Sequence, residues 1–400
     1  MTILGLYLLN QIRTGGDRRY LELMELLAER GNTVIVIINE FLDYTPIRVT
    51  KIELPVKYRR HRFPPASYLF KKNLQKNIGT LKDRIAQYSV PNGAPDFIHI
   101  HGDTHLKAAL FLKHTLHLPL FYAFRCNDID RACILRSRGG LSAGEYLFSR
   151  VYEPVNRSRE KQVAHYAELV TFQNTADKDR FLLRTGSAES KTVIIPGNIG
   201  PPRCTPAWQN KNTSSAVKNI VYIGSLSASK GLWDLLKALG LLKEKSYDFL
   251  RCYVLGRPEN SEQTMELIKK IHIEDMISLE GFKSPFPYLA EHDLMVYPTL
   301  YDAYPDTALE ALHTGCPVIA AAVGGLPDLL HYPELLFASG NIQEIADRIE
   351  RCITDTAFYQ HIRRLCARRA EAHHFDWAER FETAMADYSQ ARLNGTVSYK

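Results

Sequence analysis

The chain has 400 residues, of which 45% are hydrophobic and 24% are charged, and its formal net charge is +6. This composition is typical of folded globular proteins and excludes a disordered chain, while the length predicts two domains of similar size. The excess of basic residues is modest, and few aromatic residues are interleaved with the clearest basic cluster, at 57–62. We therefore expect no nucleic-acid partner.

The N-terminus and the cysteines predict a cytoplasmic protein. Residues 3–9 are apolar, but they lack the basic start and the small-residue cleavage site of a secretory signal. The most apolar later segment, 108–124, is interrupted by Lys113 and Pro119, so no membrane span is visible. The seven cysteines include no Cys-x-x-Cys pair, which favours reduced thiols over a disulfide framework or a zinc site.

The first 200 residues alternate between strand-like and helix-like segments. The segment 17–30 has apolar residues at helical spacing, and Gly31 separates it from the β-branched run 33–38. Predicted strands lie at 2–9, 33–38, 97–100, 118–124, 169–172 and 192–195, and predicted helices at 17–30, 106–114 and 175–184. Apolar strands that alternate with helices favour a parallel sheet that is covered on both faces.

Residues 201–218 are rich in Pro, Asn and Ser and have no period, and we interpret them as a linker. Beyond them we expect strands at 220–223, 249–255, 277–279, 294–297 and 317–320, and helices at 232–242, 261–271 and 307–313. The sequence therefore predicts an α/β protein with two doubly wound, Rossmann-like domains, 1–200 and 219–376, that face each other across a cleft. Ligands of such sheets bind at the carboxyl ends of the strands.

A short helix is predicted inside the stretch YDAYPDTALEALHTGCPVIA, residues 301–320. Pro305, Asp306 and Thr307 favour a helix start, with Asp or Thr able to cap free N–H groups, and Gly315 favours a stop about two turns later. The N-terminus of such a helix carries a partial positive charge and unpaired N–H groups, which suit a phosphate or a sugar oxygen.

Two acids flank this helix start. Asp302 would lie in the loop just before the helix, and Glu310 about one turn inside it, where both can face one pocket. Two hydrogen-bond acceptors beside a donor-rich helix end suit a sugar nucleotide. The alternative is that Glu310 faces water and Asp302 belongs to a turn.

Two further loops are candidate phosphate sites. In YIGSLSASKGL, residues 222–232, Lys230 can neutralise a diphosphate and Ser225 can donate a hydrogen bond to it, although an exposed helix start would have the same sequence. In IRTGGDRRY, residues 12–20, Gly15 and Gly16 permit close approach of the backbone to a ligand. A plain structural turn would also explain these two glycines. Neither loop matches a dinucleotide fingerprint or a P-loop.

The stretch PDFIHIHGD, residues 95–103, carries two histidines on a predicted strand. We expect His99 and His101 to point to opposite faces, so that His99 is buried and His101, at the carboxyl end, reaches the cleft. The alternative is that both are structural. No third ligand is placed beside them to make a metal site.

These stretches, in this order, resemble the retaining glycosyltransferases of the GT-B fold, the large group known as family four, or glycosyl transferases group 1. The resemblance covers nearly the whole chain. It rests on the spacing of two acids separated by seven residues, here Asp302 to Glu310, and on the segments PDFIHIHG, ELVTFQNTADKDRFL, KTVIIPGNIG, NIVYIGSLSASKGL, ISLEGF, GCPVIA and VGGLPDL.

The resemblance implies that the second domain binds a nucleotide-sugar donor. Glu310 would hold the ribose hydroxyls, Asp302 a hydroxyl of the donor sugar, and Lys230 the diphosphate. The backbone of three residues would meet the sugar and phosphate, namely Tyr304, Pro305 and Asp306. The resemblance also implies UDP- or GDP-sugar as the substrate, a retaining mechanism, and no metal or other cofactor. The sequence has no Asp-x-Asp triplet.

The family likeness also assigns roles to the first domain. His101 would lie near the reacting carbon, the Gly15–Gly16 loop would approach the phosphates or the acceptor, and the last helix, 377–393, would return to pack on this domain. Four residues depart from the family pattern. Asp302 replaces a glutamate, Ser225 an arginine whose role Arg257 is placed to take, Arg125 a histidine and Asp328 a glutamate.

Residues 51–87 and 126–150 of the first domain would recognise the acceptor. The 57–62 cluster and three arginines, Arg131, Arg136 and Arg138, suggest a sugar or lipid-linked acceptor and an anionic membrane surface at the inner membrane face. The same residues would also fit a merely solvated surface. Two rival functions remain open at this point: a nucleotide-sugar epimerase of the same fold, and a non-catalytic partner that binds a nucleotide sugar.

Overall fold

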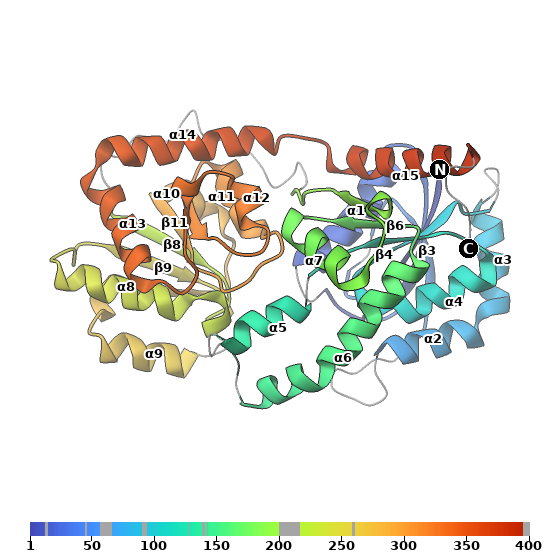
Figure 1. Ribbon diagram of the computed structural model, residues 1–400, viewed down its shortest axis with the longest axis horizontal. Helices are drawn as coiled ribbons and strands as arrows, with labels where there is room; N and C mark the ends of the chain where they lie inside the picture. The colour runs from blue at the N-terminus through green and yellow to red at the C-terminus, as the bar shows by residue number, and fades with distance from the viewer. Residues whose placement is uncertain are drawn as a thin grey trace. The chain divides into compact units, whose positions relative to one another are not determined.

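The computed structural model describes residues 1–12, 15–44, 46–56, 66–89, 94–126, 128–137, 141, 143–199, 217–257 and 261–394. The chain forms two compact units, each built on one parallel β-sheet (Figure 1). The first unit comprises Met1–Cys126, Pro154–Pro196 and Asp376–Lys400, and the second comprises Asn127–Glu153 and Gly197–Phe375. The segment 127–153, expected within the first domain, therefore groups with the second unit.

The first unit holds a seven-stranded sheet in the order β3-β2-β1-β4-β5-β6-β7. Its strands are β1 (Thr2–Tyr7), β2 (Thr33–Asn39), β3 (Thr50–Leu54), β4 (Phe97–His101), β5 (Leu120–Ala123), β6 (Leu169–Phe172) and β7 (Thr192–Ile194). Its helices are α1 (Gly15–Glu29), α2 (Ala66–Lys76), α3 (Ile78–Ser89), α4 (Leu106–Leu116), α7 (Thr175–Thr185) and α15 (Trp377–Leu393). Every residue of β1 is buried, as expected for a central strand covered on both faces.

The second unit holds a six-stranded parallel sheet in the order β10-β9-β8-β11-β12-β13. Its strands are β8 (Asn219–Ile223), β9 (Arg251–Leu255), β10 (Ile277–Gly281), β11 (Leu294–Tyr297), β12 (Val318–Ala321) and β13 (Leu336–Phe337). Its helices are α5 (Asp128–Ser137), α8 (Leu232–Glu244), α9 (Ser261–Lys270), α10 (Phe286–Glu291), α11 (Asp306–Thr314), α12 (Leu326–Leu330), α13 (Ile342–Thr354) and α14 (Thr356–Ala372). Helix α6 (Ala143–Tyr166) contributes to both units.

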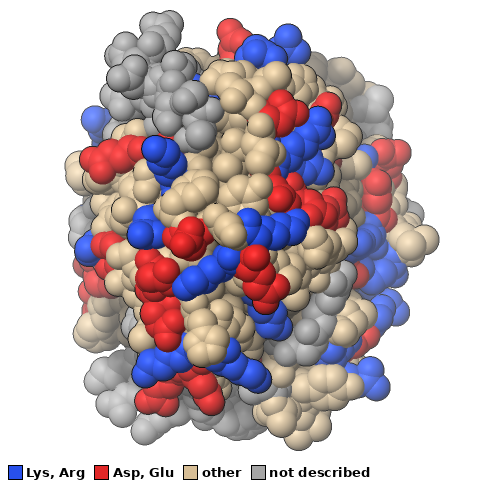
Figure 2. Space-filling model, turned by 90° about the vertical axis from the view of Figure 1, so that its left-hand side faces the viewer, with Lys and Arg blue, Asp and Glu red and all other residues tan. Residues whose placement is uncertain are grey.

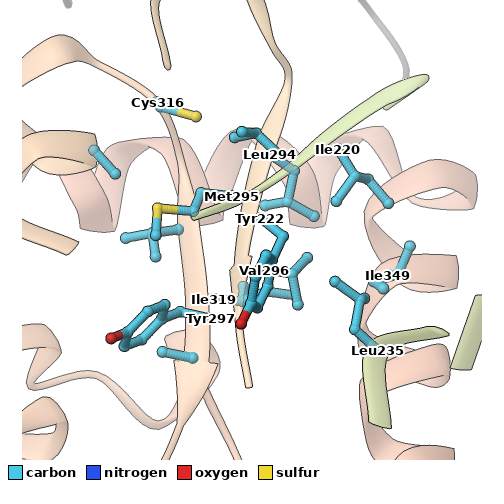
Figure 3. Packing of buried hydrophobic residues seen from close by; sticks show 14 of the residues in the cluster. Ile220, Tyr222, Leu235, Leu294, Met295, Val296, Tyr297, Cys316, Ile319 and Ile349 are labelled. Atoms are coloured by element: carbon cyan, nitrogen blue, oxygen red, sulfur yellow. The ribbon is translucent and has the colours of Figure 1, made fainter. Parts of the chain in front are cut away.

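The core of the second unit is made by side chains of β8, β11 and β12 together with helices α8 and α13. Figure 3 shows Ile220, Val296 and Ile319 packed against Leu235 of α8 and Ile349 of α13. Tyr222 and Tyr297 lie at the opposite end of the sheet from Cys316 (Figure 3). Since Cys316 precedes β12 and Tyr297 ends β11, this is the end at which the parallel strands finish.

Both sheets reverse their strand order at one internal position. In the first sheet the chain builds β1, β2 and β3 outward and then returns to place β4 beside β1; in the second, β11 is placed beside β8 in the same way. Such a reversal leaves a crevice at the carboxyl ends of the two central strands, where open α/β sheets bind ligands. The two candidate ligand positions are therefore the ends of β1 and β4 and the ends of β8 and β11.

The strands and helices predicted from apolar periodicity are all present, with ends that shift by a few residues. Helices α2, α3, α5, α6 and α10 and strands β3 and β13 were not predicted. Strand β3, Thr50–Leu54, is a short run interrupted by charges, and β13 has only two residues. The predicted linker, 201–218, lies outside the described residues except for its last two positions. Among the described residues, no helix is long and apolar enough to cross a bilayer.

Acidic and basic side chains are interspersed on the face of the molecule shown in Figure 2, which is the side where α13 and α8 lie in Figure 1. Ion pairs join these two helices: the Lys245 ammonium lies 2.6 Å from the Glu350 carboxylate and 3.8 Å from that of Asp347. This face therefore carries no extended field of one sign.

The last helix, α15, packs against α1 within the first unit. Polar groups fix it there, because Arg30 donates to Glu382 at 2.7 Å and to Asp376 at 2.6 Å. The amide of Asn32 donates to the other oxygen of Glu382 at 2.7 Å and to the Leu27 carbonyl at 3.0 Å. Glu382 thus links the end of α1 and the start of β2 to the C-terminal helix.

Replacing Glu382 with alanine should lower the free energy of unfolding of the first unit by about 1–2 kcal/mol, because Arg30 and Asn32 lose a shared acceptor that is only partly screened by water. Chemical denaturation of the wild type and the variant measures this difference. Asp387→Ala, which removes an exposed acid from the same helix, is the control and should change stability little. Equal effects of the two substitutions would contradict the assignment.

Candidate functional site

A polar loop connects β8 to α8 at the carboxyl edge of the second sheet. The Tyr222 hydroxyl donates to the Ser225 carbonyl at 2.9 Å, which holds the start of the loop. Three serine hydroxyls form a chain along it, with Ser227 lying 3.0 Å from both Ser225 and Ser229. The loop ends at Lys230, so it presents several hydroxyls and one ammonium group at the strand-order reversal.

The Lys230 ammonium forms an ion pair with Asp302, whose Oδ2 atom lies 2.7 Å away in the loop after β11. The Tyr297 hydroxyl donates to the same oxygen at 2.9 Å. The side chains of Lys230 and Asp302 are 32% and 20% exposed, so water reaches both. The pair spans the boundary between β8 and β11 and joins two of the residues that the sequence singled out.

The ion pair and burial set the protonation states here. Burial alone would lower the pKa of Lys230, but the negative charge of Asp302 outweighs it and raises that pKa above its usual value. Burial, and then the charge of Asp302, raise the pKa of Tyr297, so its hydroxyl stays a donor. The site therefore combines a permanent cation, an anion and a neutral phenol.

Two glycines hold the Asp302 loop against the next turn of the chain. Gly325 donates its N–H to the Asp302 carbonyl at 3.0 Å. An added Cβ would lie 1.8 Å from the Asp302 carbonyl oxygen at Gly324 and 1.9 Å from that of Ala303 at Gly325. Only glycine permits this approach, and the φ angle of +55° at Gly324 imposes the same restriction.

Gly231 has a similar role at the start of α8. Its φ angle is +71°, and an added Cβ would lie 1.8 Å from the carbonyl oxygen of Pro298. The Leu300 N–H also donates to the Ser229 carbonyl at 3.1 Å. The loop that carries Lys230 is therefore fixed directly onto the segment that carries Asp302.

Helix α11 begins at Asp306 and ends before Gly315, which adopts the left-handed conformation that the sequence predicts. The expectation that Asp306 or Thr307 caps it is wrong, because the N-cap residue is Pro305, whose side chain has no hydrogen-bond acceptor. Asp306 instead lies in the first turn, where its charge suits the helix dipole.

Glu310 is buried on α11, so the alternative that it merely faces water is excluded. Just before the helix, the Tyr304 hydroxyl donates to Nε2 of His373 at 2.6 Å. The other nitrogen, Nδ1, donates to the Arg369 carbonyl at 2.8 Å, which fixes the tautomer. The Tyr304 side chain is thereby bound to the C-cap residue of α14.

Arg257, the candidate substitute for the missing arginine at Ser225, follows β9. Its guanidinium carbon lies 5.2 Å from the centre of the Phe282 ring, a cation–π contact. Its carbonyl accepts a hydrogen bond from the Leu226 N–H at 3.0 Å. Arg257 thus supports the serine loop through its backbone, while its side chain lies over Phe282.

The first unit brings His99, His101 and Tyr20 together at the reversal between β1 and β4. The Tyr20 ring stacks on His99 with centroids 5.6 Å apart and on His101 at 5.9 Å. The expectation that the two histidines point to opposite faces is wrong, because residues two apart on a strand lie on the same face. Tyr20 also accepts from the Leu6 N–H at 3.0 Å and donates to the His99 carbonyl at 2.9 Å.

Both histidines line a small cavity of about 20 Å³, large enough for about one water molecule. His99 is buried, and neither of its ring nitrogens has a hydrogen-bond partner among the described residues. Burial lowers the pKa of His99 to about 3. Burial, followed by the charges of Arg125 and Arg19, holds the pKa of His101 well below its usual value. Both imidazoles are therefore neutral near pH 7.

Two arginines lie at the same edge of the first sheet. Arg19, near the start of α1, donates to the Gln173 side chain at 3.0 Å. Arg125, after β5, donates to Asp17 at 3.0 Å, so the residue in the family's histidine position is tied to the start of α1. Helix α1 begins at Gly15, directly before these contacts.

The structure also corrects part of the predicted basic surface. Arg136 is only 11% exposed and donates to Glu153 at 2.9 Å, so it is neither solvated nor open to a phosphate. Arg131 is half exposed and lies 3.3 Å from Asp128. The 57–62 cluster and Arg138 lie outside the described residues.

Several residues of the site were missed from the sequence. Tyr20, Tyr222 and Tyr297 look like ordinary core residues, and only their hydroxyl contacts show their position at the strand ends. The glycine pair at 324–325 lies in the segment VGGLPDL, and a GG pair between an apolar strand and a Pro-containing helix start is the sequence signal for its close backbone approach. Among the described residues, no three His, Cys, Asp or Glu side chains gather as a metal site.

Two family models match the chain. The model for glycosyl transferases group 1 matches residues 206–370, and the model for glycosyltransferase family 4 matches residues 13–199. The two matches correspond to the second and first units and together span most of the sequence. The chain belongs to the glycosyl transferases group 1 family, and its two α/β units have the GT-B fold of these proteins.

Curated relatives support this assignment. An uncharacterized glycosyltransferase of Methanocaldococcus jannaschii is 28% identical over 42% of this chain and 43% of its own length. The chain thus aligns with less than half of that protein. The D-inositol 3-phosphate glycosyltransferase of Pseudarthrobacter chlorophenolicus is 24% identical over 89% of this chain and 86% of its own length.

Solved structures share the fold over the whole chain. The sucrose-phosphate synthase of Thermosynechococcus elongatus has a TM-score of 0.72 and 18% identity, and the match covers 99% of this chain and all of that one. HepE of Anabaena, in complex with UDP-glucose, has a TM-score of 0.66 and 17% identity, with 98% and 100% covered.

A pH-dependent loss of stability should follow from His99. Burial lowers the pKa of His99 in the folded chain to about 3 from its ordinary value of 6.5, so between these values the unfolded chain binds a proton that the folded chain excludes. The free energy of unfolding then falls as the pH drops, by about 1.4 kcal/mol per pH unit, or about 2 kcal/mol from His99 at pH 5. Replacing His99 with leucine should remove about that much of the loss between pH 7.5 and pH 5.

Thermal or urea unfolding of both proteins at the two pH values tests this. His114→Leu, which removes an exposed histidine from α4, is the control and should keep the wild-type pH dependence. If the His99 variant loses as much stability on acidification as the wild type, the buried imidazole is not the cause.

Proposed function

We propose that the chain is an active, retaining glycosyltransferase that moves a sugar from a UDP- or GDP-sugar to a sugar or lipid-linked acceptor, in polysaccharide or glycolipid synthesis. The observation that carries the proposal is the Lys230–Asp302 pair at the strand-order reversal of the second sheet, with Glu310 buried in the helix that follows. Family membership supports the reaction type, and the UDP-glucose complex of the similar HepE structure supports the donor class.

Lys230 supplies the charge that this reaction needs. The bond between the sugar carbon C1 and the phosphate oxygen breaks, and negative charge develops on the leaving nucleoside diphosphate. An ammonium group at that point stabilises the transition state more than the ground state. The acceptor oxygen forms its bond to C1 on the same face, and its proton passes to the leaving phosphate oxygen. The proposal assigns the charge role to Lys230, so no metal or other cofactor takes part in it.

The two carboxylates suit hydroxyl groups rather than phosphates. An ionised carboxylate only accepts hydrogen bonds and repels a phosphate, whereas sugar and ribose hydroxyls donate to it. We assign the donor sugar to Asp302 and the ribose to Glu310. The backbone from Tyr304 to Asp306 and the hydroxyl of Ser225 then meet the sugar and the phosphates.

The first unit would receive the acceptor. His101, held neutral beside Tyr20, can accept or donate one hydrogen bond to a hydroxyl near the reacting carbon. Arg125, whose side chain is 32% exposed beside Asp17, and the Gly15–Gly16 start of α1 offer positive charge to an anionic acceptor group or to the donor phosphates. A lipid-linked acceptor would place the protein at the cytoplasmic face of a membrane.

Two alternatives make different predictions. A nucleotide-sugar epimerase would convert the donor without a second substrate. A non-catalytic partner would bind a nucleotide sugar and turn nothing over, and the departures at Ser225 and Asp302 are what favour it. The ion pair at Asp302 argues against it, because the shorter acid still meets Lys230 at 2.7 Å.

Replacing Glu310 with alanine should weaken binding of the donor nucleotide by about 10- to 100-fold, since a buried charged acceptor for the ribose is lost. The measurement is calorimetric titration of the purified protein with UDP, GDP, ADP and their common sugar conjugates, in the presence of EDTA. One nucleotide should bind selectively to the wild type.

Glu371→Ala is the matched control, because it removes an exposed glutamate from α14 of the same unit and should bind like the wild type. No binding of any nucleotide by the folded wild type would overturn the donor site. Binding with release of an epimerised sugar, and no need of an acceptor, would establish the epimerase instead.

Substitutions of Lys230 and of Asp302 should have different effects on nucleotide binding and on turnover. Lys230→Met should weaken UDP-sugar binding and lower kcat by at least about a hundredfold, because the leaving diphosphate loses its cation. Asp302→Asn removes a negative charge beside the phosphates, so it should bind the free nucleotide at least as tightly as the wild type while turnover falls. Parallel losses of nucleotide binding in both variants would show that the pair acts only as a structural link.

A further inference from the structure

The residues that line the small cavity beside His101 include three ring nitrogens without a hydrogen-bond partner in the described part of the chain. They are Nδ1 and Nε2 of His99 and Nε1 of Trp377, and the cavity measures about 20 Å³. His99 and Trp377 are only 1% and 7% exposed, so bulk water does not satisfy these atoms. Because buried polar groups nearly always have a partner, the three nitrogens point to a molecule bound in the cavity.

The first turn of α15 brings the indole to this cavity. Trp377 follows the N-cap residue Asp376, which accepts from Arg30 at 2.6 Å. The Phe381 ring meets the Trp377 indole edge-on with centroids 5.5 Å apart, and it meets the His99 ring in the same way at 5.7 Å. The three rings therefore pack together within the first unit, and the C-terminal helix supplies one wall of the cavity.

Two other polar side chains of the cavity wall already have partners. The Gln173 oxygen accepts from Arg19 at 3.0 Å. The Tyr20 hydroxyl accepts from the Leu6 N–H at 3.0 Å and donates to the His99 carbonyl at 2.9 Å. The imidazole and the indole are therefore the groups that decide what the cavity binds.

The size and the lining of the cavity favour water as its ligand. A volume of about 20 Å³ exceeds the roughly 10–15 Å³ that one water molecule needs, but it is too small for a sugar ring or a phosphate. The indole N–H can only donate, whereas the neutral imidazole of His99 has one donor and one acceptor. A water oxygen can accept from Trp377, and a water hydrogen can be donated to His99. A metal cation is disfavoured, since Arg19 lies in the wall and the described residues that line it include no carboxylate.

We propose that the cavity binds one water molecule, which connects Trp377 and His99 to the ring of His101, and that Trp377 is therefore a positioning residue for His101. Tyr20 stacks on the His101 ring with centroids 5.9 Å apart and an angle of 15° between the planes. Stacking restrains the tilt of the ring but does not decide which of its nitrogens carries the proton.

The water molecule decides this. Because it accepts from the indole of Trp377, both of its hydrogens are available, one for each imidazole. The His101 nitrogen that faces the cavity then accepts, so the proton lies on the other nitrogen. The outward nitrogen of His101 is therefore a fixed donor to an oxygen of the ligand.

This inference rests on the proposed function only in the role of His101 near the reacting carbon. The water and the tautomer are measured without donor or acceptor, so their failure leaves the nucleotide titration untouched. Conversely, failure of the titration leaves the water site standing and removes only its catalytic meaning.

The test combines diffraction and NMR on the full-length protein without substrate. A high-resolution crystal structure should show one water within hydrogen-bond distance of Trp377 Nε1 and of a His99 nitrogen. Isotope-edited NMR of labelled histidines near neutral pH should show a single tautomer for His101, whose signals are assigned by their absence from a His101→Gln variant.

Two substitutions should remove this single tautomer. Trp377→Phe keeps an aromatic ring but removes the indole donor. Ala123→Val adds two methyl groups at the cavity wall and should displace the water. In each variant the His101 signals should become those of a mixture of both tautomers, because the hydrogen bond that selects one of them is lost.

Met385→Leu is the matched control, because Met385 is 1% exposed on the same helix and is not among the residues that line the cavity. It should keep both the water and the single tautomer, and all variants should keep the wild-type circular dichroism as evidence of folding. Four results would overturn the inference: no density in the wild-type cavity, a halide ion in place of the water, a mixture of His101 tautomers in the wild type, or a single tautomer that survives in both variants.

Discussion

The ion pair between Lys230 and Asp302 is the contact on which the candidate site depends. It joins the loop after β8 to the loop after β11, which are the two loops that diverge where the strand order of the second sheet reverses. Tyr297 donates to the same carboxylate and Gly325 to the same residue's carbonyl, so the acid is held from three directions. Because both charges remain partly exposed, neither bears the full cost of burial, and a ligand can still reach them.

A buried tyrosine hydroxyl recurs at the ends of the central strands in both units. Tyr20 connects the Leu6 N–H of β1 to the His99 carbonyl of β4, and Tyr222 and Tyr297 bind the two loops of the second unit. Each phenol offers an apolar ring to the core and one polar atom to the strand end. The pattern explains how polar loops are anchored directly onto two apolar sheets.

The sequence predicted most of the strands and the position of the acids, because apolar periodicity and helix stop signals act locally. The sequence could not show that Lys230 and Asp302, far apart in the chain, form an ion pair. It also could not show that Arg136 forms an ion pair with Glu153. The error over His99 and His101 came from the strand geometry itself, since alternate residues share a face. The missing side-chain cap of α11 was unpredictable for another reason: Pro305, Asp306 and Thr307 each fit a helix start, and only the backbone angles decide which is the N-cap.

Two of the four departures from the family pattern, at Ser225 and Asp302, have a common structural context. On the loop 224–231 the sequence GSLSASKG contains one basic residue, Lys230, because Ser225 stands where an arginine is common. The shorter acid at Asp302 still reaches this lysine, because glycines at 231, 324 and 325 let the surrounding backbone approach within distances that any Cβ would prevent. A binding site with one cation depends more strongly on the position of that cation than a site with two cations does. The ion pair between one lysine and one short acid therefore keeps the charges of this loop balanced despite both departures.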